Sequence, residues 1–140
     1  MIVLDISGAA LARARARVGD AGATWIEADV TGEWSAPDVD IWHDRAAFHF
    51  LTDASDRAAY VTRLRRQVRP GGHVIIATFA LDAPPRCSGL PVMRYSPASL
   101  SAELGSAFDL VESVDERHLT PSGQVQPFSY CRFTFRGPVD

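Results

Sequence analysis

The sequence contains no lysine, so all 14 basic residues of the 140-residue chain are arginines. A Schiff-base enzyme, a phosphate-binding loop of the Walker type and a lysine general base all need a lysine amine. The absence of lysine therefore excludes these three chemistries. The 17 acidic residues outnumber the arginines and give a net charge of −3. Because phosphate backbones bind basic surfaces, we expect no nucleic acid partner.

Cysteine is scarce, and its two positions form no metal-binding pattern. Cys87 and Cys131 lie far apart without a CxxC spacing. A disulfide framework and a tetrahedral zinc site both depend on clustered residues at characteristic spacings. His43 and His118 add no such spacing. We therefore expect no bound metal and reduced cysteines, which is typical of a cytoplasmic protein.

Long hydrophobic runs and a secretion signal are also missing. No apolar stretch approaches the roughly 18 residues that a membrane-spanning helix needs, and the N-terminus has no basic segment followed by a long apolar run. We therefore expect neither secretion nor a membrane partner. A composition with 46% hydrophobic and 22% charged residues is typical of a globular protein. The length predicts a single domain over residues 1–140.

Apolar strands and amphipathic helices alternate along the chain, which predicts an α/β fold with a three-layer, mostly parallel sheet. The last two strands follow each other without a helix and predict a closing antiparallel hairpin. Residues 70–72, Pro-Gly-Gly, are expected to end the second helix. The proline-rich segment 83–95 is expected to be irregular and to cover a ligand. The expected strands are 2–6, 23–28, 39–42, 73–79, 108–114 and 128–135, and the expected helices are 8–18, about 53–68 and 96–105.

The strand at 39–42 runs directly into a dense group of polar and aromatic residues. The group consists of His43, Asp44, Arg45, Phe48 and His49. In an open α/β sheet, ligands bind where the strands end, so this group is a candidate site. The alternative is a surface turn in which Asp44 caps a short helix and Arg45 is solvated.

Four motifs follow one another in a recognisable order. They are Leu4-Asp5-Ile6-Ser7, Glu27-Ala28-Asp29, the stretch VDIWHDRAAFHFL at 39–51, and Arg69-Pro70-Gly71-Gly72 before HVIIATF. Taken in this order, they resemble the class I S-adenosylmethionine-dependent methyltransferases over essentially the whole chain. The resemblance implies a Rossmann-like sheet, S-adenosyl-L-methionine as the cofactor and a small-molecule methyl acceptor.

The resemblance also implies which residues bind the cofactor. Asp5 would accept hydrogen bonds from the ribose hydroxyls, since a carboxylate offers paired acceptors to a diol. Asp29 would contact the adenine. The stretch from His43 to Phe48 would line the methionine end, where Asp44 could take the cofactor's ammonium or help to orient the acceptor. Asp5 could instead help to cap the following helix, and Asp29 could be a simple turn residue. The full cofactor-binding set is Asp5, Ile6, Asp29, Val30, His43 and Asp44.

Methyl transfer asks little of the protein beyond alignment, because the sulfonium is already activated. A general base matters only for weak acceptors. The candidates for a catalytic role are His43, Asp44 and His49, and each of the two histidines could instead be structural. Aromatic residues of the last strand would either line the acceptor or pack in the core: Phe128, Tyr130 and Phe133.

One part of the family pattern is missing. The family's first strand and its glycine-rich turn should precede Asp5, but only four residues do, and no GxGxG motif occurs elsewhere. We therefore expect the fold with its first strand missing. Three consequences are open: direct pairing of strand 2–6 with strand 39–42, a strand supplied by a second copy in a homodimer, or a poorly stable product.

Two other functions stay open beside methyl transfer. The missing glycine-rich turn favours a noncatalytic methyltransferase-like remnant, or a dimerising module, that binds no cofactor. A nicotinamide-dependent oxidoreductase would also have an acidic residue after a parallel strand. It would need the same glycine-rich turn and does not explain the closing hairpin, so it ranks last.

Overall fold

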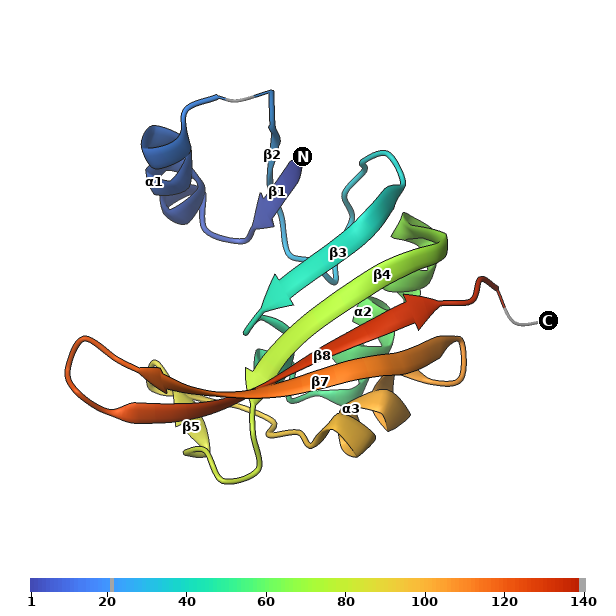
Figure 1. Cartoon of the computed structure of the whole chain (residues 1–140). Coiled ribbons are helices and arrows are strands. Elements are labelled where there is room, and N and C mark those ends of the chain that lie inside the picture. Colours follow the sequence, from blue (N-terminus) through green and yellow to red (C-terminus); the bar gives the residue numbers. More distant parts are fainter. Residues whose placement is uncertain (21, 139–140) are drawn as a thin grey trace. The chain divides into compact units, whose positions relative to one another are not determined.

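The computed structural model describes residues 1–20 and 22–138 (Figure 1). The contacts between residues divide the chain into two compact units, Met1–Pro37 and Asp38–Asp140. Each unit has a sheet of its own. The single domain expected over residues 1–140 stays a prediction.

The first unit consists of two parallel strands and the helix that connects them. β1 (Ile2–Asp5) pairs with β2 (Thr24–Glu27), and α1 (Gly8–Val18) lies between them in the sequence. The Ser7 side chain caps α1 by accepting a hydrogen bond of 3.1 Å from a backbone N–H of the first turn. Gly19 follows the helix with a φ of 73°, which favours glycine. The bounds of α1 are therefore those that the sequence predicts.

The second unit is built on a four-stranded sheet with the order β3-β4-β8-β7. β4 is parallel to β3 and antiparallel to β8, and β7 is antiparallel to β8. The strands are β3 (Val39–Arg45), β4 (Val68–Phe79), β7 (Phe108–Leu119) and β8 (Val125–Phe135). The α/β fold and its closing antiparallel hairpin are thus confirmed, although both hairpin strands are longer than predicted.

Two helices cover one face of this sheet (Figure 1). They are α2 (Ala54–Gln67), which Asp53 caps, and α3 (Pro97–Leu104), which Ser96 caps. Burying an apolar side chain of this layer contributes about 1.5–3 kcal/mol. Phe133 belongs to the layer and therefore packs in the core instead of lining an acceptor. The fully buried side chains of the layer include Tyr60, Leu64, Val74, Ile76, Leu100, Leu104 and Phe133.

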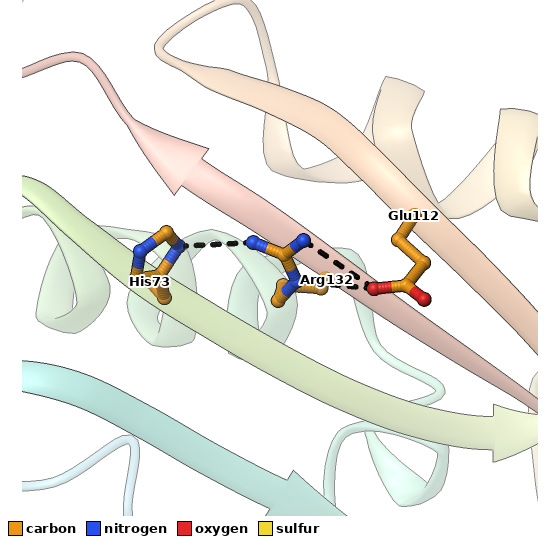
Figure 2. A network of polar contacts seen from close by, with 3 residues as sticks. All are labelled: His73, Glu112 and Arg132. Carbon is orange, nitrogen blue, oxygen red and sulfur yellow. Dashed lines mark hydrogen bonds and ion pairs between the residues drawn. The ribbon is translucent and has the colours of Figure 1, made fainter.

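The opposite face of the sheet carries a row of charged and polar side chains (Figure 2). Arg132 of β8 lies between His73 of β4 and Glu112 of β7. Its Nη2 atom is 3.3 Å from Glu112 Oε2, and its Nη1 atom is 3.5 Å from His73 Nδ1. Side chains of a strand alternate between the two faces, which explains how Arg132 can follow the buried Cys131 directly.

One predicted helix end is wrong. The Pro-Gly-Gly sequence at 70–72 does not end α2, because α2 already ends at Gln67 and these three residues lie within β4. The register between β3 and β4 shifts between Val39 and Ile41. Such an irregularity accommodates proline and glycine within a strand.

The segment at 83–95 is also more regular than predicted. It contains a small antiparallel hairpin of β5 (Arg86–Cys87) and β6 (Leu90–Pro91). Ser88 and Gly89 at its turn have φ values of 53° and 78°. A two-residue hairpin turn of type I′ needs positive φ at both positions. The sequence does not predict this turn, because its first position holds a serine where such turns prefer asparagine, aspartate or glycine.

The alanine variant of Gly72 is expected to lower the free energy of unfolding by about 2 kcal/mol. A Cβ atom at Gly72 would lie 2.8 Å from the backbone carbonyl oxygens of Arg69 and Asp40, which cannot yield without moving their strands. Gly123→Ala is the control, because a Cβ there meets nothing within 4 Å and the positive φ alone costs about 1 kcal/mol. Urea unfolding of both variants measures the difference, and a smaller loss for Gly72→Ala would contradict the prediction.

Within the first unit β1 pairs with β2, and within the second unit β3 pairs with β4. The three consequences that the sequence leaves open for the missing strand all stay predictions.

Candidate functional site

The first unit places the predicted adenosine-binding residues after neighbouring strands. Asp5 is the last residue of β1, and the register pairs it with Glu27, the last residue of β2. Ile6 follows Asp5 directly, while Asp29 and Val30 follow the end of β2. Because both strands are parallel, these residues gather at one edge of the two-stranded sheet. Ligands of α/β proteins bind at this kind of edge.

Asp5 and Asp29 each use one carboxylate oxygen to hold their own turn. Asp5 Oδ1 accepts a hydrogen bond of 2.7 Å from the backbone N–H of Ser7. Asp29 Oδ1 accepts from the backbone N–H and the hydroxyl of Thr31, at 2.9 and 2.7 Å. Within the described residues, the Oδ2 atom of each aspartate has no hydrogen-bond partner. The local role as cap or turn residue therefore leaves one acceptor oxygen for a ligand.

Ile6 and Val30 differ in their surroundings. The Ile6 side chain is 70% exposed, so it is available to an apolar ring at the strand end. Val30 is half-buried, and its carbonyl oxygen accepts a hydrogen bond of 3.0 Å from the indole N–H of Trp34. That bond fixes the backbone directly after Asp29.

In the second unit, His43 and Asp44 point to opposite faces of the sheet, as neighbours in a strand do. His43 lies in register with Ile75, which in turn pairs with Arg132, so His43 belongs to the polar face. It is exposed, and no described residue forms a hydrogen bond with its ring. Asp44 is only 7% exposed and faces the helical layer. The structure thus separates these two candidates.

The Asp44 carboxylate accepts three hydrogen bonds. The backbone N–H groups of Ala47 and Phe48 donate at 2.8 and 3.0 Å, and the Tyr60 hydroxyl donates at 2.5 Å. The Trp42 indole N–H donates in turn to Tyr60 at 3.0 Å. Burial raises the pKa of Asp44, although these bonds favour its charged form. These contacts tie Asp44 to the turn that follows β3, as in the alternative that the sequence leaves open, but Asp44 is buried and does not lie on a surface turn.

His49 lies in the short 3₁₀ helix η1 (Phe48–Phe50) and is fully buried. Its Nδ1 atom accepts a hydrogen bond of 3.0 Å from the backbone N–H of Phe79. The ring proton therefore lies on Nε2, which has no partner within the described residues. Burial lowers the pKa of His49 to about 4. At neutral pH the ring is uncharged and its lone pair is engaged, so it can donate a hydrogen bond but not accept a proton.

The structure brings Arg45 of the candidate group together with two aromatic residues of β8 that the sequence offers as acceptor-lining or core residues. Arg45 Nε donates a hydrogen bond of 2.8 Å to the Tyr130 hydroxyl, and its guanidinium lies 5.6 Å from the centre of the Phe128 ring. The partners are far away in the sequence, so the sequence alone does not show that Arg45 reaches them. The alternation of Phe128 and Tyr130 in β8 was the available signal that both face one side of the sheet.

Comparison with known families identifies the class of protein. A family model described as a methyltransferase domain matches residues 1–76, which is more than half of the chain. The chain belongs to this family. The predicted resemblance to class I S-adenosylmethionine-dependent methyltransferases is thereby confirmed. No curated protein matches this methyltransferase domain.

Solved methyltransferases share the fold of this domain. The N-methyltransferase NodS from Bradyrhizobium japonicum is 20% identical, with a TM-score of 0.75 over 96% of this chain and 72% of that chain. A methyltransferase from Methanosarcina mazei is 11% identical, with a TM-score of 0.73 over 98% of this chain and 82% of that chain. At these identities the likeness concerns the fold.

A third similar structure carries bound small molecules. It is the 1,6-didemethyltoxoflavin-N1-methyltransferase from Burkholderia thailandensis, with 1,6-didemethyltoxoflavin and S-adenosylhomocysteine bound. It is 17% identical, with a TM-score of 0.71 over 96% of this chain and 60% of that chain. Together with the family, it supports S-adenosyl-L-methionine as the cofactor of this methyltransferase domain.

The described helices of this methyltransferase domain are too short or too polar to cross a membrane.

Proposed function

We propose that this chain transfers a methyl group from S-adenosyl-L-methionine to a small molecule. The observation that carries the proposal is the carboxylate of Asp5 at the end of β1. One of its oxygens is fixed by Ser7 N–H, and the other has no partner among the described residues. A fixed carboxylate with a free oxygen suits the vicinal hydroxyls of a ribose.

Asp29 and the backbone next to it are proposed to contact the adenine of the cofactor. The free Oδ2 of Asp29 can accept a hydrogen bond from an exocyclic amine. The exposed Ile6 side chain supplies apolar surface, and the Val30 backbone, held by Trp34, keeps this edge rigid. These four residues, Asp5, Ile6, Asp29 and Val30, fit the adenosine part of the cofactor in their chemistry.

His43 and Asp44 are proposed to serve the methionine end in different ways. When bound, the cofactor supplies a methyl group that is already activated on its sulfonium. Asp44 acts as a positioning residue, because its oxygens hold Ala47, Phe48 and Tyr60. Where an acceptor must lose a proton, His43 is the candidate with a free ring, whereas the lone pair of His49 is engaged.

The test is a calorimetric titration of S-adenosylhomocysteine into the wild-type chain and the Asp5→Ala variant. We expect saturable binding by the wild type and binding about 10- to 100-fold weaker for Asp5→Ala, because a hydrogen bond to a charged group contributes about 1.5–3 kcal/mol. Asp20→Ala is the matched control: Asp20 is exposed and pairs with Arg15 at 2.7 Å. Its affinity should equal that of the wild type.

The alternative function is a noncatalytic methyltransferase-like module, with a second copy as its partner. The local hydrogen bonds of Asp5 and Asp29 favour it, because both carboxylates have a structural role that needs no cofactor. A well-folded wild-type chain that does not bind S-adenosylhomocysteine would support this alternative and refute methyl transfer by this chain. Equal affinities of the wild type and Asp5→Ala would refute only the ribose-binding role of Asp5 and would not refute methyl transfer.

A further inference from the structure

Arg45 is held across three strands of the second unit. It is the last residue of β3, where its register partner on β4 is Ala77, and Ala77 pairs in turn with Tyr130 on β8. The small alanine leaves room for the arginine side chain to pass over β4. Arg45 Nε reaches the Tyr130 hydroxyl at 2.8 Å. An exposed arginine is thereby fixed in one orientation.

Phe128 supports the same guanidinium. It lies two residues before Tyr130 in β8 and therefore on the same face of the sheet. The Arg45 guanidinium carbon lies 5.6 Å from the Phe128 ring centre, and Phe128 packs edge-on against Phe79 at 5.1 Å. Arginine stacks well on aromatic faces, which limits its freedom further. Phe128 is buried, whereas Arg45 is exposed. The arginine is therefore presented to solvent on a rigid apolar base.

The terminal nitrogens of Arg45 are free to bind a ligand. Within the described residues, neither Nη atom has a hydrogen bond or an ion pair. Glu116 of β7 acts on Arg45 through space. It does not come within ion-pair distance, so it does not occupy the guanidinium fork. An arginine fork with two free N–H groups matches the two oxygens of a carboxylate.

An apolar cluster continues from Phe128, the ring that supports this arginine. Ala83 and Val92 from the segment with the β5–β6 hairpin pack on Phe79 and Phe128, and Cys87 lies against the same cluster. Val114 of β7, the register partner of Tyr130, adds an apolar side chain that is 53% exposed. One positive group among apolar surface is the composition of a small-molecule site.

We propose that Arg45, oriented by Tyr130 and Phe128, binds a carboxylate of the methyl acceptor, so that the acceptor is a small carboxylic acid with an apolar body. The inference rests on the proposed function in one respect, namely that the bound carboxylic acid is the methyl acceptor. The binding of a carboxylate can be tested without methyl transfer. Arg45 and Tyr130 would recognise the substrate and take no part in the chemical step. The alternative is that Arg45 has a purely structural role and only links β3 to β8.

The experiment uses benzoate as the probe and benzamide as its uncharged counterpart. Nuclear magnetic resonance titrations of the full chain follow the backbone N–H signal of Ala77, the register partner of Arg45, which is present in the wild type and in every variant. We expect saturable shifts with benzoate and at least about tenfold weaker binding of benzamide, since the charged hydrogen bonds are lost. Arg45→Gln and Arg45→Lys should each weaken benzoate binding about tenfold or more, because lysine keeps the charge but not the fork. Tyr130→Phe should weaken it severalfold.

Arg69→Gln is the matched control, because Arg69 is exposed and pairs with Asp40 at 2.9 Å near the other end of β4. It should leave benzoate binding unchanged. Equal binding of benzoate and benzamide, or benzoate binding that survives in a folded Arg45→Lys variant, would overturn the proposal. S-adenosylhomocysteine titrated into the wild-type chain separates the two claims. Cofactor binding by the wild type without benzoate binding overturns the acceptor class alone, and benzoate binding by the wild type without cofactor binding overturns methyl transfer alone.

Discussion

Replacing Asp44 with alanine should lower the free energy of unfolding by about 3–5 kcal/mol. The substitution leaves three donors without their acceptor: the N–H groups of Ala47 and Phe48, and the Tyr60 hydroxyl. Tyr60 is fully buried and Phe48 is fully buried, so water cannot replace the carboxylate at these groups without opening the core. An unsatisfied buried donor costs about 1–3 kcal/mol.

Urea unfolding followed by circular dichroism measures this loss. Asp53→Ala is the matched control, because Asp53 also accepts a backbone hydrogen bond at the start of a helix but is exposed. A lost N-cap of this kind costs about 1 kcal/mol. If both variants lost the same stability, the burial of Asp44 and its bond to Tyr60 would carry no weight, and the positioning role proposed for Asp44 would fail.

Elements with strong local signals were predictable from the sequence. The helix α1 has a serine cap and a closing glycine, and its bounds are as predicted. Ser96, Pro97 and Gly105 mark α3 in the same way. Such signals act over three or four residues, so a sequence displays them completely.

The β4 strand shows where local signals mislead. Its residues 70–72 read as a helix stop, but the chain enters the strand directly after Gln67. Pairing with β3 decides this, since the register shift opposite these residues admits them into the sheet. A tertiary contact of this kind overrides the local preference of the residues for turn or strand, and it cannot be predicted from the residues of the segment alone.

The candidate site was predictable in its location but not in its geometry. The polar group after β3 was found because polar residues follow an apolar strand. Which face each residue would take depends on where β3 ends, and the strand continues to Arg45. As a result His43 and Arg45 share the polar face and Asp44 enters the core. The bond between Arg45 and Tyr130 depends on the order of β3, β4 and β8.

The burial of His49 predicts a stability that depends on pH in a defined direction. The folded chain holds His49 with a pKa of about 4, whereas an unfolded histidine has a pKa of about 6.5. Between these values the unfolded chain binds a proton that the folded chain does not. Stability from the neutral, buried ring is therefore fully present above about pH 6.5 and is lost as the pH falls toward about 4. The difference corresponds to about 3 kcal/mol.

The measurement compares the wild type with His49→Asn by urea unfolding from pH 7 downward. Asparagine offers an oxygen to the Phe79 N–H in place of Nδ1 but does not titrate. We expect the stability advantage of the wild type over this variant to shrink by about 3 kcal/mol as the pH falls from about 7 to about 4. All other titratable groups are the same in both proteins, so the difference isolates the histidine. A constant difference between wild type and His49→Asn would mean that the ring takes up its proton in the folded state, and His49 would return as a candidate general base.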